Sequence, residues 1–217
     1  MASTMLHYII SSKVAENINI KDLNMFLLGA AFAPDTGNKE DGSYHKLHYL
    51  DTISEKGIKG FNFSRCAAEH ADKMNDDYHL GYCCHIMQDA LWFHDVCHPF
   101  VRVYDKEIKI EKIREVYRDY MRLNYLLQKE QDVVIVPPEF SMVPDTEIDP
   151  ESLLRVINNF IEQIAAPPCV KEDLELLRWD VITDYIDKTV SFCTREISHI
   201  LDGTGCIDAE KYFVESL

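Results

Sequence analysis

The residues best suited to chemistry are His85 and Asp89, which stand four apart inside a long apolar segment, 80–95. At that spacing an imidazole and a carboxylate project from the same face of a helix. Such a pair can hold a transition metal at about 2.0 to 2.2 Å, the distance typical of Zn²⁺, if other ligands converge on it. Candidate partners lie upstream at His7, Asp35 and His48. The sequence therefore predicts a metal site.

Two ligands from one helix do not complete such a site, because a hydrolytic zinc needs about three protein ligands and an open position. Asp35 follows the end of a predicted helix in the sequence Ala-Pro-Asp, which holds a short carboxylate rigidly. His45 and His48 come next along the chain, and the spacing does not decide which of them would be the loop ligand. His94 lies about 180° around the helix from His85, so it can join only if the helix bends between them.

Composition limits the kinds of partner that this chain can have. With 37 acidic and 22 basic residues its formal net charge is −15, which argues against binding to duplex DNA or to anionic membranes. A local basic or metal-lined cleft could still bind a small phosphoester. The 217 residues are 47% hydrophobic, enough for one buried core, and no Gly/Ser/Pro-rich linker divides them, so we expect a single domain over 1–217 with the metal ligands mainly in 1–95.

The cysteines, the start of the chain and the length of its apolar stretches indicate the cellular compartment of the protein. Seven cysteines are an odd number, they include an adjacent pair, and they show no Cys-x-x-Cys spacing, so neither a disulfide framework nor a zinc ribbon is expected. The start of the chain has no signal-peptide pattern, and no stretch is long and apolar enough to span a bilayer. We therefore expect a cytoplasmic protein with reduced thiols and no integral membrane association.

Apolar residues recur at helical spacing along most of the chain. The pattern and its capping residues predict an all-α, single-domain bundle of about seven to nine helices. Helices are expected at about 4–18, 21–32, 62–74, 77–97, 108–129, 150–166 and 173–201. In the helix at 108–129 the inward stripe is expected to contain Ile110, Ile113, Val116, Tyr117 and Tyr120. Residues 35–59 are expected to be a long loop, and 133–136 an extended connector.

The order of these motifs resembles a known family. His7 is followed by Leu-Leu-Gly-Ala-Ala-Phe-Ala-Pro-Asp35, then Lys46-Leu-His48-Tyr49, then Leu80-Gly-Tyr-Cys-Cys-His85-Ile-Met-Gln-Asp89-Ala-Leu-Trp92. Together they resemble the zinc-dependent phospholipase C family, particularly its small intracellular members, over roughly the first 95 residues. The combined order and spacing carry the resemblance, whereas each fragment alone is a weak signal.

The resemblance implies a helical fold of the phospholipase C and single-strand nuclease type. It also implies up to three zinc ions in a cleft and hydrolysis of phosphoesters by a metal-activated water. By position it assigns ligands to His7, Asp35, His48, His85, Asp89 and His94, with Asp35 as a general base and Asp89 as a carboxylate bridging two ions. The chain departs from secreted members by lacking their N-terminal tryptophan and a His/Glu pair four apart downstream, so we expect one or two ions.

Two alternatives remain open from the sequence. His94-Asp95 could be the adjacent pair of an HD-type metal phosphohydrolase, completed by His48 or His70 and by one of three later aspartates, Asp180, Asp184 or Asp187. The chain could also be a helical module that binds metal without catalysis. The leading interpretation is a zinc-dependent phosphoester hydrolase whose substrate is a small phosphoester of unspecified type.

Overall fold

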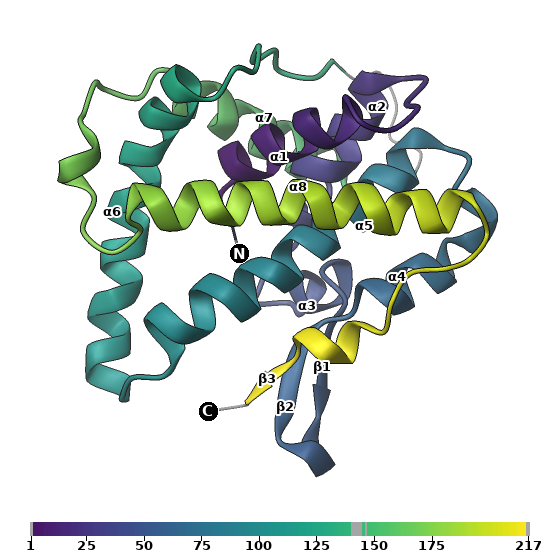
Figure 1. Ribbon diagram of the computed structural model, residues 1–217, viewed down its shortest axis with the longest axis horizontal. Coiled ribbons are helices and arrows are strands. Elements are labelled where there is room, and N and C mark those ends of the chain that lie inside the picture. The colour runs from purple at the N-terminus through teal and green to yellow at the C-terminus, as the bar shows by residue number, and fades with distance from the viewer. Residues whose placement is uncertain (1, 140–144, 146, 216–217) are drawn as a thin grey trace.

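The computed structural model describes residues 2–139, 145 and 147–215. These residues form eight α-helices and a small sheet (Figure 1). The helices are α1 (Thr4–Ala15), α2 (Leu23–Leu27), α3 (Ser43–Leu47), α4 (Phe63–Glu69), α5 (Asp77–Trp92), α6 (Lys106–Glu130), α7 (Pro150–Ile164) and α8 (Trp179–Leu201). The predicted helical bundle of seven to nine helices is confirmed. No helix in the described ranges has the length and apolarity needed to cross a membrane.

Helix α5 is the central element of the bundle. Every residue from Tyr78 to Trp92 is buried, because α1, α2, α4 and α8 all contact this helix. Two π-helical segments extend neighbouring helices: η1 (Leu28–Phe32) continues α2, and η5 (Phe93–Arg102) continues α5. The helix expected to stop near Cys97, before Pro99, therefore runs on to Arg102 with wider turns. Short π-helical segments of this kind often occur at functional sites.

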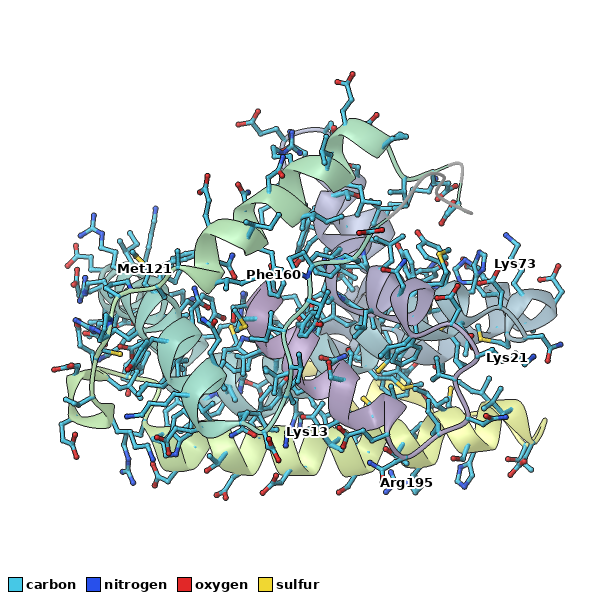
Figure 2. The ribbon with its side chains drawn as sticks, turned by 90° about the horizontal axis from the view of Figure 1, so that it is seen from above. Lys13, Lys21, Lys73, Met121, Phe160 and Arg195 are labelled. Atoms are coloured by element: carbon cyan, nitrogen blue, oxygen red, sulfur yellow. The ribbon has the colours of Figure 1, made fainter. Side chains whose placement is uncertain are left out.

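Aromatic side chains pack α1, α7 and η1 together. The ring of Phe160 stacks on Tyr8 at 5.1 Å and meets the edge of Phe32 at 5.2 Å. Phe160 is fully buried at this junction, whereas the labelled Lys21 and Lys73 lie toward the right edge of the molecule in Figure 2. Such aromatic pairs add to the stability given by burial alone.

The expected long loop at 35–59 is more ordered than its composition indicated. Within it the 3-10 turn η2 (Pro34–Thr36) leads to α3, and β1 (Leu50–Ile53) pairs antiparallel with β2 (Ile58–Phe61). The short strand β3 (Val214–Glu215) then pairs with β2 at the other edge. The loop prediction was wrong because strands of four residues leave too short an alternation to detect against many polar side chains.

Helix α8 begins later than the expected residue 173. Buried Asp119 of α6 accepts hydrogen bonds from the backbone N–H groups of Glu175, Leu176 and Leu177. This segment therefore satisfies its donors through a side chain from another helix, and α8 starts only at Trp179. The apolar spacing of this segment does not reveal a tertiary contact of that kind.

The expected inward stripe of α6 was wrong for its first half. Ile110, Ile113 and Tyr117 are exposed, and continuous burial begins only near Leu123. Figure 1 shows why, since the first turns of α6 extend away from the body of the bundle. Ile113 and Tyr117 line a surface cavity, as do Val116 and Tyr120, which also pack against the core.

Candidate metal centre

Four separate elements supply the five side chains that converge at the centre of the bundle. His7 lies near the start of α1, where the side chain of Ser3 caps the helix by accepting from the Leu6 N–H. Asp35 lies in η2, directly after the proline that ends the preceding helix. His48 caps the C-terminus of α3, and α5 contributes the remaining two side chains, His85 and Asp89, from one face.

The imidazole nitrogens and carboxylate oxygens lie within a few ångströms of one another. The Nε2 atom of His7 is 3.4 Å from Asp89 Oδ1, and Nε2 of His85 is 3.7 Å from Asp89 Oδ2. His48 Nε2 lies 3.3 Å from Asp35 Oδ1 and 3.7 Å from Asp89 Oδ2. The rings of His7 and His85 stack with centroids 3.9 Å apart. The predicted convergence of the five residues is therefore present in the structure.

Each of the three imidazoles is held by a hydrogen bond at Nδ1. His85 Nδ1 donates to the carbonyl oxygen of Ala30 at 3.1 Å, and His48 Nδ1 donates to the carbonyl of Tyr44 at 2.9 Å. His7 Nδ1 bonds to Oε1 of Gln88 at 3.0 Å. Because these oxygens only accept, each Nδ1 carries a proton, and in the neutral form of each ring Nε2 presents a lone pair. This is the arrangement by which outer groups orient histidine ligands of a metal.

Three atoms at the centre of the cluster have no hydrogen-bond partner among the described residues. Nε2 of His7, Nε2 of His85 and Oδ2 of Asp89 are buried and make no hydrogen bond among the described residues. Buried polar atoms are normally paired, so three neighbouring unpaired ones need an explanation. Two overlapping sets of ligand atoms fit a metal ion: His7, Asp35 and His85 in one, and His48, His85 and Asp89 in the other. Because Nε2 of His85 has a single lone pair, His85 can bind one ion only, and a second ion in the cluster would need a carboxylate that bridges the two.

The electrostatics of the cluster keep the carboxylates ionised. Burial opposes ionisation of Asp89, but the imidazole of His7, with Nε2 3.4 Å from Oδ1, holds the pKa of Asp89 below the usual range. The pKa of Asp35 is likewise lowered, against burial, by its bond to His48. Burial lowers the pKa of His85 to about 3, whereas the pKa of His7 is raised because Asp89 outweighs the effect of burial. Two carboxylates and a neutral imidazole at neutral pH suit a divalent cation.

Close helix packing fixes the position of the Ala30 carbonyl. Gly29 of η1 and Gly81 of α5 face each other, and a Cβ atom on either would lie 2.1 Å from a backbone oxygen of the opposite segment. Only glycine permits this approach. The two glycines thus bring η1 against α5 and allow Ala30 to reach His85.

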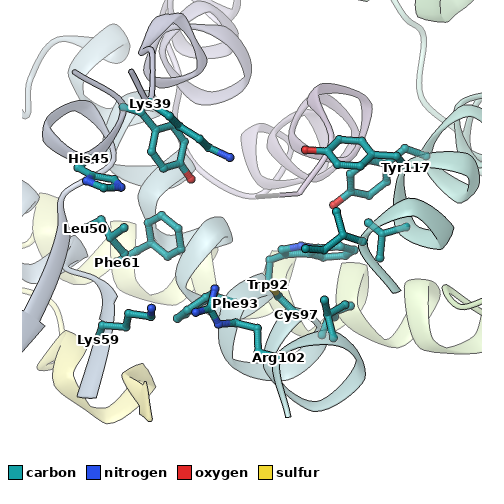
Figure 3. Close-up of a pocket in the computed structure, with 16 residues that line it drawn as sticks. Lys39, His45, Leu50, Lys59, Phe61, Trp92, Phe93, Cys97, Arg102 and Tyr117 are labelled. Carbon is teal, nitrogen blue, oxygen red and sulfur yellow. The ribbon is translucent and has the colours of Figure 1, made fainter. Parts of the chain in front are cut away.

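The cluster meets solvent at Asp35, whose side chain is 11% exposed, whereas the other four side chains are fully buried. Asp35 lines a cavity of about 320 Å³ beside α1 and α6. That cavity shares Lys39, Tyr117 and Tyr120 with a neighbouring one of about 410 Å³. In Figure 3 Lys39 and Tyr117 lie on opposite sides of this larger cavity. A small molecule held there would have access to the exposed edge of the cluster.

The larger cavity combines aromatic walls with positive charge. Tyr44, Phe61, Trp92 and Phe93 are among its aromatic residues. Lys39, Lys59 and Arg102 also line it, with no acidic residue among the described lining (Figure 3). In a chain of net charge −15 this is a local site suited to an anion with an apolar or aromatic group.

The structure distinguishes the other sequence candidates. His48 is buried in the cluster, whereas His45 is exposed and lines the larger cavity, so His48 is the loop residue that meets the other ligands. His94 lies apart, in η5, with Nδ1 2.6 Å from Asp95 and its ring against Tyr212. Among the described residues it belongs to no set of potential metal ligands. Its assignment as a ligand of the His/Asp cluster is therefore not supported, because its Nδ1 is bonded to Asp95 and its ring packs on Tyr212.

The HD-type alternative needs His94 and Asp95 as metal ligands, and the contacts of Asp95 do not favour this. Asp95 forms an ion pair with Lys188 of α8 at 2.6 Å, so its charge is already compensated by a protein cation. The candidate histidines His48 and His70 both lie in other clusters, away from His94.

Residues that sequence reasoning missed are Gln88, which orients His7, and the cavity cations Lys39, Lys59 and Arg102. Gln88 lies three residues after His85, a spacing that marks a helical neighbour but no ligand function. The cations come from three distant segments, so no local pattern relates them.

Comparisons of this chain with family models, curated proteins and solved structures gave no match.

Proposed function

We propose that this protein is a metal-dependent hydrolase of phosphoesters. The observation that carries the proposal is the buried His/Asp cluster, with lone pairs directed at one another, at the edge of an aromatic cavity bearing three cations. A binding module needs the ligands alone, whereas a hydrolase also needs an accessible edge and a place for an anionic substrate. The exposed edge of Asp35 and the two adjoining cavities supply these.

We propose zinc as the metal, because histidine nitrogen and carboxylate oxygen suit it and because the sequence resembles zinc-dependent phospholipases C. His7, Asp35, His48, His85 and Asp89 would hold one or two ions. When bound, such an ion lowers the pKa of a water towards neutrality and offsets negative charge on a phosphoryl group.

The protein groups have separate functions in this proposal. Asp89 lies within reach of all three imidazoles and would bridge the two sets of ligands. Asp35 stays ionised and reaches solvent, so its carboxylate can accept a proton from water at the cavity edge. Lys39, Lys59 and Arg102 would hold the phosphate, and the aromatic walls would hold the rest of the ester.

The test is hydrolysis of bis-p-nitrophenyl phosphate by protein stripped with a chelator and then reloaded with zinc. We expect turnover only after reloading, and we expect Lys39→Ala to raise KM with little loss of bound metal. A panel of phosphomonoesters and phosphodiesters extends the assay. Stoichiometric zinc with no turnover on the whole panel would show a binding module and would contradict the proposal.

A further inference from the structure

A second group of metal-ligating side chains joins α4 to α5, apart from the His/Asp cluster. Cys66 and the residue after α4, His70, stand four apart, as do His79 and Cys83 of α5. At that spacing each pair projects from one face of its helix. Each helix therefore offers one sulfur and one imidazole toward the other.

Three of these side chains already lie together. Cys66 Sγ is 3.0 Å from Cys83 Sγ and 3.7 Å from Nδ1 of His70. Their ligand atoms all lie within 4.8 Å of one another. Both cysteines are fully buried and free, whereas His70 is half-buried at the edge of a cavity of about 490 Å³. An ion could therefore reach the group from the His70 side.

The fourth side chain, His79, is a buried group beside them that makes an ion-pair contact but no hydrogen bond. It is only 4% exposed, and neither ring nitrogen makes a hydrogen bond among the described residues. Its nearest charged neighbour is Asp76, with Nδ1 3.7 Å from Oδ1. Its ring centroid lies 5.3 Å from that of His70. Two unpaired nitrogens in the interior are costly unless something binds them.

We propose that Cys66, His70, His79 and Cys83 form a second, structural metal site with thiolate and imidazole ligands. Two sulfurs and two nitrogens make a closed tetrahedral set for Zn²⁺ or a similarly soft divalent ion, and they disfavour Mg²⁺ and Ca²⁺. The two sulfurs would separate to about 3.8 Å, the tetrahedral edge for Zn–S bonds of about 2.3 Å, and His79 would turn toward them. Binding releases the two thiol protons to solvent.

This site would join α4 to α5 through His79 and Cys83, and Cys83 lies two residues before His85. The proposed site is independent of the proposed hydrolase activity. The two thiols could instead be oxidised to a disulfide by hydrogen peroxide, which takes up their two protons and two electrons and is reduced to two waters. Counting reactive thiols in denatured, unreduced protein distinguishes these states. The metal site predicts seven reactive thiols, as the sequence contains, whereas a disulfide leaves five and overturns the proposal.

The direct experiment is reconstitution of metal-free protein with Co²⁺, because thiolate ligands give a charge-transfer band in the near ultraviolet and His/Asp ligands do not. We expect this band in the wild-type protein and in Asp89→Asn. It should be lost in Cys66→Ser and Cys83→Ser and retained in Cys169→Ser, the matched control. Cobalt bound without the band, or the same band in both serine variants, would overturn the proposal.

His70→Gln and His79→Gln keep the test decisive if a serine variant fails to fold, which circular dichroism would show. We expect each to weaken Co²⁺ binding at the thiolate band by about tenfold or more. Unchanged affinity in both would overturn the proposal. Because Asp89→Asn affects only the first cluster, loss of hydrolysis and loss of the thiolate band are separate outcomes.

Discussion

At the scale of single residues, the decisive feature is that three imidazoles are anchored at Nδ1 and directed by Nε2 toward two carboxylates. The sequence predicted His7, Asp35, His48, His85 and Asp89 as a set, largely through motif order. It did not predict Gln88, because an anchoring amide has no characteristic spacing of its own. It also included His94, whose place beyond the end of α5 depends on the π-helical continuation.

The carboxylate at position 89 should be indispensable for metal binding. Asp89→Asn removes the negative charge that faces all three imidazoles, so we expect zinc affinity to fall by at least about a hundredfold, with loss of hydrolysis. Isothermal titration calorimetry measures this. Asp95→Asn is the matched control, because Asp95 pairs with His94 and Lys188 instead. Loss of metal in Asp95→Asn but not in Asp89→Asn would favour an HD-type site.

The hydrogen bond from Gln88 should contribute to affinity without contacting the ion. Gln88→Met keeps the side-chain volume but removes the acceptor for His7 Nδ1, so zinc binding should weaken by about 10- to 100-fold. Gln128→Met on α6 is a control, since the Gln128 amide donates to the backbone carbonyl of Asn124 in the preceding turn of α6 and does not bond to a residue of the cluster. Equal effects of the two substitutions would argue against a specific contribution of Gln88.

Metal affinity should depend on pH through His7. Its pKa is raised above 6.5, because Asp89 outweighs burial, so a proton competes with the ion for Nε2 over a wider range than at a free imidazole. Affinity should therefore rise with pH through the raised pKa, by up to about tenfold per unit for one proton, and then level off. Zinc titrations across a pH series measure it. Affinity that is constant from alkaline pH down to 6.5 would contradict this account.

At the scale of elements, the long periodic helices could be predicted and the tertiary exceptions could not. α1, α5 and α7 follow their apolar spacing and their capping residues, whereas α6 has nearly the predicted bounds but exposes most of the apolar side chains of its first half. The late start of α8 reflects Asp119 binding three backbone N–H groups, and the sheet reflects strands too short to show alternation. The glycines that bring η1 against α5 also gave no functional signal, although they position the Ala30 carbonyl.

Gly81→Ala should therefore affect both stability and the site. The added methyl group would lie 2.1 Å from the Phe26 carbonyl oxygen of α2 and 3.1 Å from the Ala30 nitrogen of η1, so it would force α2 and η1 away from α5. We expect a loss of about 2 kcal/mol in the free energy of unfolding, and weaker zinc binding as the Ala30 carbonyl leaves His85. Urea unfolding and zinc titration measure the two effects.

Gly57→Ala is the control for this substitution. Gly57 has a positive φ of 62° but no neighbour near its missing Cβ, so alanine there strains the backbone without separating helices. It should lower stability by about 1 kcal/mol and leave zinc affinity unchanged. Equal zinc affinities in the Gly57 and Gly81 variants would contradict the proposed link between η1 packing and the site.

At the scale of the whole molecule, function depends on a cavity that no single segment encodes. Its walls come from the start of α3, the β1–β2 hairpin, η5 and the first half of α6. Ile113 and Tyr117 of α6, which were expected to be core, are exposed and belong to these walls. An acidic chain thus presents a local cationic pocket next to buried metal ligands, which composition alone does not reveal.

The most direct test of this account is a crystal structure of zinc-loaded protein with anomalous data collected at the zinc absorption edge. The account predicts one or two anomalous peaks bonded to Nε2 of His7, His48 and His85 and to carboxylate oxygens of Asp35 and Asp89. If fully loaded crystals show no peak among these atoms, the central claim is contradicted, whatever zinc binds elsewhere.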